Sequence, residues 1–155
     1  MIKGDITLVQ ADIIVNAANR IGYMGGWMGK HFKCNGVAES IQYVTKGEVE
    51  KEAIRIALQN KLRPGDIFVT SSGNLRAKYI IHAITMWLPG MFSNYKTIEK
   101  LLPKIIEQAR RLSVKTVAIP FLGAGTGRLS QKRVLTLYEN HFKNISDMEI
   151  IIVQK

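Results

Sequence analysis

Short apolar runs alternate with amphipathic helical stretches along this chain, and the alternation restricts its fold more than any other feature. Residues 11–17 and 77–84 are largely apolar runs, which are typical of strands buried within a parallel sheet. Between residues 98 and 112, apolar side chains recur every three or four positions, as they do on one face of a helix. Because alternating strands and helices pack as a helix-covered sheet, we expect an α/β fold with a largely parallel sheet.

The expected elements follow from these patterns and from the turn residues between them. Strands are predicted within residues 2–9, 11–17, 66–70, 77–84, 116–119 and 149–153. Helices are predicted at residues 37–44, 48–59, 98–112 and from Ser130 to Phe142, and the glycine-rich segment 20–36 is expected to be irregular. Pro103 should kink the long helix or lie in its first turn. No linker or repeat interrupts the pattern, so residues 1–155 are expected to form a single domain.

The composition predicts a protein of the cytoplasm. Cys34 is the only cysteine, so no disulfide can form within the chain, and a reducing compartment is expected. The first residues carry no secretion signal, and no apolar run approaches the roughly 20 residues that span a bilayer. We therefore expect a soluble, cytoplasmic protein without a membrane partner.

The formal net charge of +10 suits an anionic partner such as a nucleic acid. The basic residues do not form one tract, because lysines and arginines are mixed with glutamates in segments such as 48–52 and 107–111. A solvated surface with many ion pairs is the alternative. We favour a general attraction for anions over specific nucleic-acid binding, since the sequence has no RNA-binding signature with interleaved aromatic residues.

A glycine-rich loop links an apolar strand to an amphipathic helix between residues 119 and 130. Gly123, Gly125 and Gly127 let backbone N–H groups turn toward an anion, and the next helix adds partial positive charge at its N-terminus. Ser130 offers the side-chain oxygen of a helix N-cap. The spacing matches neither a Walker loop nor the dinucleotide fingerprint, and such a loop can also serve only to turn the chain.

A second loop with candidate ligand residues leaves the strand at 11–17. Asn16 and Asn19 close that strand, and their amides can hydrogen-bond ribose hydroxyls or stabilise the turn through Asx-type bonds. Ligands of parallel sheets bind beyond the carboxyl ends of the strands, where this loop and the glycine-rich loop both emerge. Two loops with many backbone donors at one sheet edge suit a diphosphate.

Successive segments of the chain resemble, in order, the signature motifs of macro domains. These segments are residues 4–7, 12–19, 35–41, 65–75, 78–82 and 119–125. The resemblance covers most of the chain and implies a three-layer α/β/α sandwich with a central mixed, mostly parallel sheet. It also implies ADP-ribose as the ligand, free or attached to protein or nucleic acid. Because backbone amides and one carboxylate can select a nucleotide diphosphate without a metal, we expect no cofactor and no metal.

The same resemblance implies roles for individual residues. Asp5 matches the aspartate that accepts a hydrogen bond from the adenine N6 amine, and Ile6 lines the adenine pocket. Asn19 matches the asparagine that reaches the distal ribose, and Asn16 matches the one that supports this loop. The two diphosphate loops are Gly36, Val37 and Ala38 on one side, and Gly123, Ala124, Gly125, Thr126 and Gly127 on the other.

The sequence departs from the family pattern at three places. Residues 27–35 interrupt the family's Gly-Gly-Gly-Val segment, and Ala38 replaces an aspartate found in many hydrolytic members. In the second loop, Gly127-Arg128 replaces a common aromatic–glycine pair. Arg128 is a candidate partner for a phosphate or an acidic leaving group, although we favour an orientation into solvent. His31 and Cys34 are too few for a structural zinc site, which has four ligands.

The leading hypothesis is a protein that binds ADP-ribose or ADP-ribosylated substrates. It extends to a hydrolase, either a phosphatase for ADP-ribose 1″-phosphate or an enzyme for ADP-ribosyl esters, in which Asn19 and Gly36 hold the attacking water. Because Ala38 removes a carboxylate that could orient this water, we place binding before catalysis. The alternative is a basic module that binds RNA or poly-ADP-ribose without catalysis.

Overall fold

The computed structural model describes residues 1–155 and contains one six-stranded sheet in the order β1-β6-β5-β2-β4-β3. The strands are β1 (Ile2–Lys3), β2 (Ile13–Asn19), β3 (Ile67–Ser71), β4 (Tyr79–Met86), β5 (Thr116–Pro120) and β6 (Glu149–Gln154). The helices are the 3₁₀ turn η1 (Ile6–Leu8), α1 (Gly26–His31), α2 (Val37–Thr45), α3 (Glu48–Gln59), α4 (Tyr95–Arg111) and α5 (Gln131–Phe142). Only β3 and β4 pair antiparallel, so the sheet is mixed and mostly parallel, as expected.

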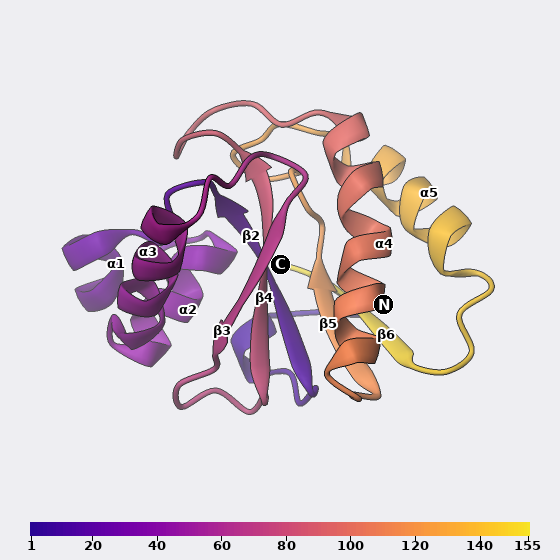
Figure 1. Cartoon of the computed structure of the whole chain (residues 1–155), viewed down its shortest axis with the longest axis horizontal. Helices are drawn as coiled ribbons and strands as arrows, with labels where there is room; N and C mark the ends of the chain where they lie inside the picture. The colour runs from indigo at the N-terminus through magenta and orange to yellow at the C-terminus, as the bar shows by residue number, and fades with distance from the viewer.

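Helices cover both faces of the sheet and complete a three-layer α/β/α sandwich (Figure 1). α1, α2 and α3 lie on one side of the sheet, and α4 and α5 lie on the other. Alternation along β2 sends neighbouring side chains into two different cores. Ile13 and Val15 pack with residues of α4 and α5, whereas Ile14 packs with Ile41 of α2 and Ala53 of α3. The apolar runs are continuous because both faces of the central strands are buried.

The N-terminal strand is much shorter than the edge strand expected within residues 2–9. β1 pairs with β6 only through Ile2 and Lys3. Gly4, at φ +146°, redirects the chain, and the Asp5 carboxylate accepts hydrogen bonds from the Thr7 N–H (3.0 Å) and hydroxyl (2.8 Å). Such local hydrogen bonds compete with the hydrogen bonds between paired strands, and here they cap the beginning of the 3₁₀ turn η1. The chain therefore turns at Asp5, which leaves this residue at the carboxyl edge of the sheet.

The structure tests two predictions about the helices: the position of Pro103 and the N-cap at Ser130. Pro103 lies in the middle of α4, outside its first turn. Because proline has no N–H, the carbonyl of Glu99, four residues earlier, lacks its helical hydrogen bond. Both residues are exposed, so water can reach this carbonyl. Ser130 precedes α5 but makes no side-chain cap hydrogen bond, so the expected N-cap oxygen is wrong. The Ser130 N–H instead donates to the Tyr95 hydroxyl (3.1 Å), which ties the end of the glycine-rich loop to α4.

Asp12 joins three neighbouring strands at the edge of the sheet opposite their carboxyl ends. Its carboxylate contacts Lys78 Nζ (2.8 Å), just before β4, and accepts hydrogen bonds from the N–H groups of Lys115 (2.9 Å) and Thr116 (3.1 Å) at the start of β5. The hydrogen bond from Lys78 and then that from the Lys115 N–H lower the pKa of Asp12 to about 2, although burial opposes this shift.

We expect Asp12→Asn to reduce the loss of stability in acid. An unfolded aspartate has a pKa of about 3.9, above the folded value, so the stabilisation by Asp12 is complete above about pH 5 and is lost as the pH falls from about 4 to about 2. After allowance for solvent screening, the natural chain should lose about 1 kcal/mol more than the variant across this range. Urea unfolding at several acidic pH values measures both losses, and equal losses would contradict this role.

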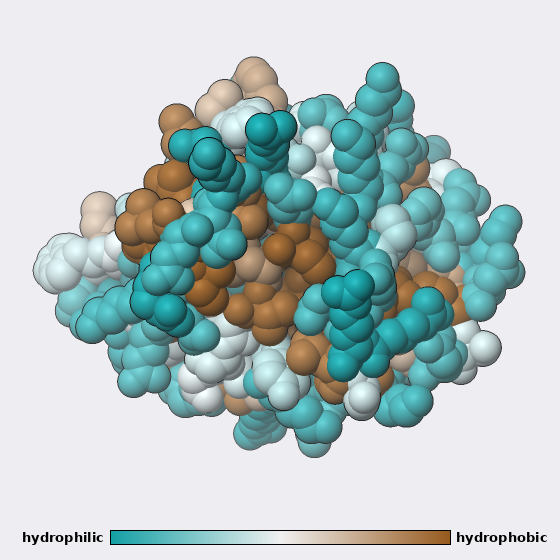
Figure 2. Space-filling view, viewed as in Figure 1, coloured by the Kyte–Doolittle hydropathy of each residue, from teal (hydrophilic) through white to brown (hydrophobic).

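Polar and charged side chains cover most of the molecular face in Figure 2, with apolar surface gathered toward its upper left and centre. The large apolar side chains left exposed include Leu58, Trp87 and Phe92. No helix is both long and apolar enough to cross a membrane.

Candidate ligand-binding cleft

Two adjoining hollows open at the carboxyl edge of the sheet. The Asp5 hollow has about 610 Å³ of free space, and Asp5, Ile6 and Lys155 are among its lining residues. The Asn19 hollow has about 790 Å³, and Asn19 and Tyr23 are among its lining residues. The residues that line both hollows are Gly36, Val37, Pro120, Phe121 and Gly125. The hollows therefore form one cleft, at the edge of the sheet where small molecules bind in α/β folds.

Eleven of the thirteen residues predicted to contact a ligand line this cleft. They are Asp5, Ile6, Asn19, Gly36, Val37, Ala38, Gly123, Ala124, Gly125, Thr126 and Gly127. They come together because β2 and β5 are parallel neighbours, so that the loops following them emerge side by side. Asn16 and Arg128 line neither hollow.

Backbone N–H groups without acceptors belong to both loops of the cleft. On one side are the N–H groups of Val37 and Ala38 in the first turn of α2, and on the other are those of Gly125 and Thr126. The first N–H groups of a helix have no partner within it, and the helix dipole adds partial positive charge there. The cleft thus has donors for an anion on two sides.

Tyr138 of α5 holds the glycine-rich loop where it leaves β5. Its buried hydroxyl donates to the Pro120 carbonyl (2.6 Å) and accepts from the Leu122 N–H (2.9 Å). Burial raises the pKa of this hydroxyl, so it stays protonated and remains a donor. Further along, a Cβ on Gly127 would lie 2.6 Å from the Gly123 carbonyl oxygen, so the loop is closely packed against itself.

Asn19, the last residue of β2, makes the Asx-type bonds that were one of its two expected roles. Its Oδ1 accepts from the N–H groups of Ile21 and Tyr23, both at 3.2 Å, and its Nδ2 donates to the Tyr23 carbonyl (2.8 Å). The second Nδ2–H has no acceptor in the protein. Asn19 therefore stabilises the turn and keeps one donor available for a ligand.

Asn16 lies inside β2 rather than at its end and is fully buried. Its Nδ2 donates to His82 Nδ1 (3.1 Å). The Thr70 hydroxyl donates to the Ser71 carbonyl (2.9 Å), so it accepts a hydrogen bond from His82 Nε2 (2.9 Å). Burial lowers the His82 pKa to about 3, which keeps the ring neutral. Asn16 thus belongs to an internal network, while its part in supporting the loop stays a prediction.

Arg128 turns toward the segment before α4. Its guanidinium carbon lies 4.6 Å from the centre of the Phe92 ring, within the range of a cation–π interaction. The residue has φ +59°, in the left-handed region that favours glycine. Its exposed side chain therefore contacts an aromatic ring at the surface rather than the cleft.

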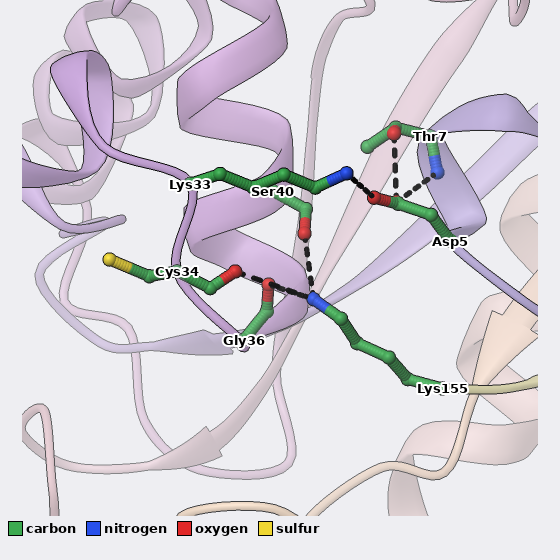
Figure 3. A network of polar contacts seen from close by, with 7 residues as sticks. All are labelled: Asp5, Thr7, Lys33, Cys34, Gly36, Ser40 and Lys155. Atoms are coloured by element: carbon green, nitrogen blue, oxygen red, sulfur yellow. Dashed lines mark hydrogen bonds and ion pairs between the residues drawn. The ribbon is translucent and has the colours of Figure 1, made fainter.

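Two lysines that the sequence did not indicate lie at the Asp5 end of the cleft (Figure 3). Lys33, from the segment between α1 and α2, has its Nζ 3.6 Å from Asp5 Oδ2. Lys155, which follows β6, has its Nζ 2.9 Å from the Ser40 hydroxyl. Burial raises the pKa of Asp5, but the hydrogen bonds from Thr7 and the charges of the two lysines lower it overall. Asp5 is therefore an ionised hydrogen-bond acceptor at this end.

Glu39 supplies the cleft with a carboxylate, whereas its neighbour Ala38, at the position of the family aspartate, does not. It lines the Asn19 hollow and makes no ion pair, and a Cβ on Gly36 would collide with its Oε2. Its place in the first turn of α2, three residues after Gly36, is the sequence signal that could have identified it.

The inserted residues 27–35 form most of α1 and the return of the chain to α2. Glu50 of α3 anchors the glycines before them, because its Oε2 accepts from the N–H groups of Met24 (2.6 Å) and Gly26 (3.0 Å). Trp27 is 68% exposed and lines neither hollow, whereas Asn35 lines the Asp5 hollow. The insertion therefore contributes to the rim of the cleft through its last residues.

The structure contains no group of three or more His, Cys, Asp or Glu side chains that could hold a metal ion. His31 Nδ1 lies 2.9 Å from the Trp27 carbonyl oxygen, within its own helix. Cys34 is partly buried, and its carbonyl oxygen lies 3.4 Å from Lys155 Nζ.

Residues 15–138 match the Macro domain family, and the chain belongs to this family. An uncharacterized protein of Aquifex aeolicus is 39% identical over 127 residues, which cover 82% of this chain and 70% of that protein. An uncharacterized protein of Aeropyrum pernix is 34% identical over 131 residues, which cover 84% of this chain and 63% of that protein. The chain thus spans less than two thirds of the Aeropyrum relative.

Solved structures share this fold. The macrodomain of Mycobacterium tuberculosis DarG superposes with a TM-score of 0.83 at 24% identity, covering 99% of this chain and 97% of that one. Thermosipho africanus DarTG, solved in complex with ADP-ribose, gives a TM-score of 0.79 at 20% identity, covering 98% of this chain and 40% of that one. These likenesses confirm the three-layer sandwich that the sequence predicted.

Proposed function

We propose that the cleft binds ADP-ribose, free or attached to a macromolecule. The observation that carries the proposal is the order of chemical groups along the cleft: the Asp5 carboxylate at one end, unpartnered N–H groups between, and Asn19 at the other. ADP-ribose has the complementary order of an amine-bearing base, a diphosphate and a ribose. The complex of the related Thermosipho africanus protein with ADP-ribose supports the same ligand here.

Each part of the ligand finds suitable chemistry in this arrangement. Asp5 Oδ2 accepts from the adenine N6 amine, and Ile6 provides an apolar wall for the base. The N–H groups of Val37 and Gly125 bind the diphosphate, as backbone amides at helix N-termini and glycine loops do elsewhere. The free Nδ2–H of Asn19 donates to a hydroxyl of the distal ribose.

The proposal extends to hydrolysis at the distal ribose, with Glu39 as the general base. Glu39 lines the Asn19 hollow beside Asn19 and Gly36, the two residues predicted to hold the attacking water. A carboxylate without an ion-pair partner in a cleft is available to accept a proton. The water oxygen attacks the anomeric carbon of the distal ribose, and the bond from this carbon to the acceptor oxygen breaks. The acceptor leaves as a carboxylate or phosphate, and Glu39 takes the proton of the water.

Asp5→Asn should remove the preference for adenine while preserving the local fold. The asparagine Oδ1 can still accept the Thr7 hydrogen bonds, whereas its NH₂ group opposes the adenine N6 amine. We expect the natural chain to bind ADP-ribose at least about 10-fold more tightly than its inosine analogue, in which an oxygen replaces this amine. The variant should bind ADP-ribose more weakly and should favour the inosine analogue, because its NH₂ group can donate to that oxygen, as measured by titration calorimetry.

Asp66→Asn is the matched control, because Asp66 is paired with Lys104 on the surface and lies outside the cleft. This variant should keep the affinity and the base preference of the natural chain. Failure of the natural chain to bind ADP-ribose at millimolar concentration would overturn the proposal.

The alternative of a basic module for RNA or poly-ADP-ribose predicts a different response to salt. Its net charge of +10 would make binding fall steeply with ionic strength, because counterions are released from the polyanion. Binding of this kind would be insensitive to Asp5→Asn. ADP-ribose bound in the cleft should instead respond strongly to this substitution and weakly to salt.

A further inference from the structure

The Asp5 end of the cleft holds two ammonium groups and one carboxylate. In Figure 3 the side chains of Lys33 and Lys155 reach toward this end from opposite sides of the view. Lys33 Nζ is 3.6 Å from Asp5 Oδ2, and the charge of Lys155 also acts on the Asp5 carboxylate. One positive charge is therefore left without a carboxylate partner.

Lys155 is the lysine that makes no close ion pair, although its charge, like that of Lys33, lowers the pKa of Asp5. The partners of its Nζ are all neutral oxygens: the Ser40 hydroxyl at 2.9 Å and the carbonyls of Cys34 at 3.4 Å and Gly36 at 3.5 Å. The two carbonyl contacts are long for hydrogen bonds and are readily exchanged for a better acceptor. An anionic oxygen would be that acceptor, since it adds a charge–charge attraction that a neutral hydroxyl or carbonyl oxygen lacks.

The position of Lys155 determines which part of the ligand it can reach. Lys155 lines the Asp5 hollow but not the Asn19 hollow, whereas Gly36, next to its Nζ, lines both. Its ammonium group thus lies between the carboxylate assigned to the base and the N–H groups assigned to the diphosphate. The part of ADP-ribose that connects base and diphosphate is the adenosine ribose.

ADP-ribose itself has no charge there to match Lys155. Its adenine and adenosine ribose are neutral, and both of its negative charges lie on the diphosphate, which the backbone N–H groups already serve. A compact ammonium group beside a ribose is well suited to a phosphoryl group on a ribose hydroxyl. Dinucleotide sites use a basic side chain in the same way to accept a 2′-phosphate.

We infer that this end of the cleft is a subsite for a phosphoryl group carried by the adenosine ribose of the ligand, bound by Lys155 with Lys33 as a second cation. The inference rests on the proposed ADP-ribose site and names its preferred substrate class: adenosine diphosphate derivatives with an additional phosphate at the 2′ or 3′ position. Lys33 contributes less than Lys155 because its ammonium group is already paired with the Asp5 carboxylate at 3.6 Å.

The test compares ADP-ribose with ADP-ribose 2′-phosphate by titration calorimetry at low salt. The natural chain should bind the 2′-phosphate at least about 10-fold more tightly, the effect expected for a charge-assisted contact. Lys155→Gln retains a donor for Ser40 but loses the charge, so the ratio of the two affinities should fall to about one. If Lys155 only held residues 34–36 in place, the substitution would weaken both ligands equally, and this result would overturn the inference.

Lys96→Gln is the matched control, because Lys96 is exposed on α4 and lines neither hollow. It should keep the full preference for the 2′-phosphate. Equal affinity of the natural chain for the two ligands would overturn the inference and leave ADP-ribose binding intact, whereas binding of neither would overturn both. Comparison of ADP with its 2′-phospho and 3′-phospho derivatives identifies the hydroxyl, since only the correct isomer should gain affinity over ADP.

Discussion

Gly125→Val should abolish ADP-ribose binding and leave the fold intact. A Cβ on Gly125 would have no atom within 4 Å outside its chain neighbours, and the residue is not in the left-handed region, so the substitution strains nothing. Gly125 lines both hollows, however, so a larger side chain occupies the place where they join. We expect an affinity loss of at least about 100-fold, equivalent to about 2.8 kcal/mol, with an unchanged melting temperature.

Two further variants make this result specific. Gly125→Ala adds less volume and should give an intermediate loss of affinity. Gly127→Ala should instead lower the melting temperature, because its Cβ would lie 2.6 Å from the Gly123 carbonyl oxygen and 2.8 Å from Ser93 Cβ. Tight binding of ADP-ribose by Gly125→Val would show that the ligand does not cross the junction of the two hollows.

Glu39→Gln should separate catalysis from binding. Glutamine has nearly the same shape as glutamate but cannot take a proton from water, so hydrolysis of an ADP-ribosyl ester or of ADP-ribose 1″-phosphate should slow by about 100-fold or more. Affinity for ADP-ribose should be maintained or rise, because the variant removes a negative charge from the cleft that we propose for the diphosphate. Single-turnover kinetics and calorimetry measure the two effects separately.

Glu48→Gln is the matched control for this experiment. Glu48 is an exposed glutamate in the first turn of the next helix, α3, so its substitution changes the net charge equally without touching the cleft. It should retain the natural rate. An unchanged rate for Glu39→Gln, or no turnover by the natural chain, would contradict the role of Glu39 as a general base.

The main lines of the fold and cleft could be predicted because they depend on local patterns and sheet topology. The apolar runs around Val15 and Ile81 identified the central strands, since both faces of these strands are buried. A parallel sheet then places the loops after β2 and β5 at one edge, whichever residues they contain. For this reason Asn19, Gly36 and Gly125 line one cleft although they are far apart in the sequence.

The features that sequence reasoning missed depend on contacts between distant residues. The buried partner of Asn16 is His82, which lies 66 positions away, so the polar residue looked like the end of a strand. Lys155 meets Ser40 across 115 positions, and no periodicity reveals such a contact. Asp5 shortens the first strand through bonds to Thr7 that a propensity for extended structure does not take into account.

The two lips of the cleft are supported by different layers of the molecule. Glu50 of α3 holds the segment around Met24 and Gly26 from one face of the sheet, whereas Tyr138 of α5 holds the glycine-rich loop from the other. Substitutions in one layer can therefore reshape one lip while the opposite lip keeps its geometry. In evolutionary terms, the two sides of such a cleft can diversify separately, because a change in the layer behind one lip leaves the support of the other lip in place.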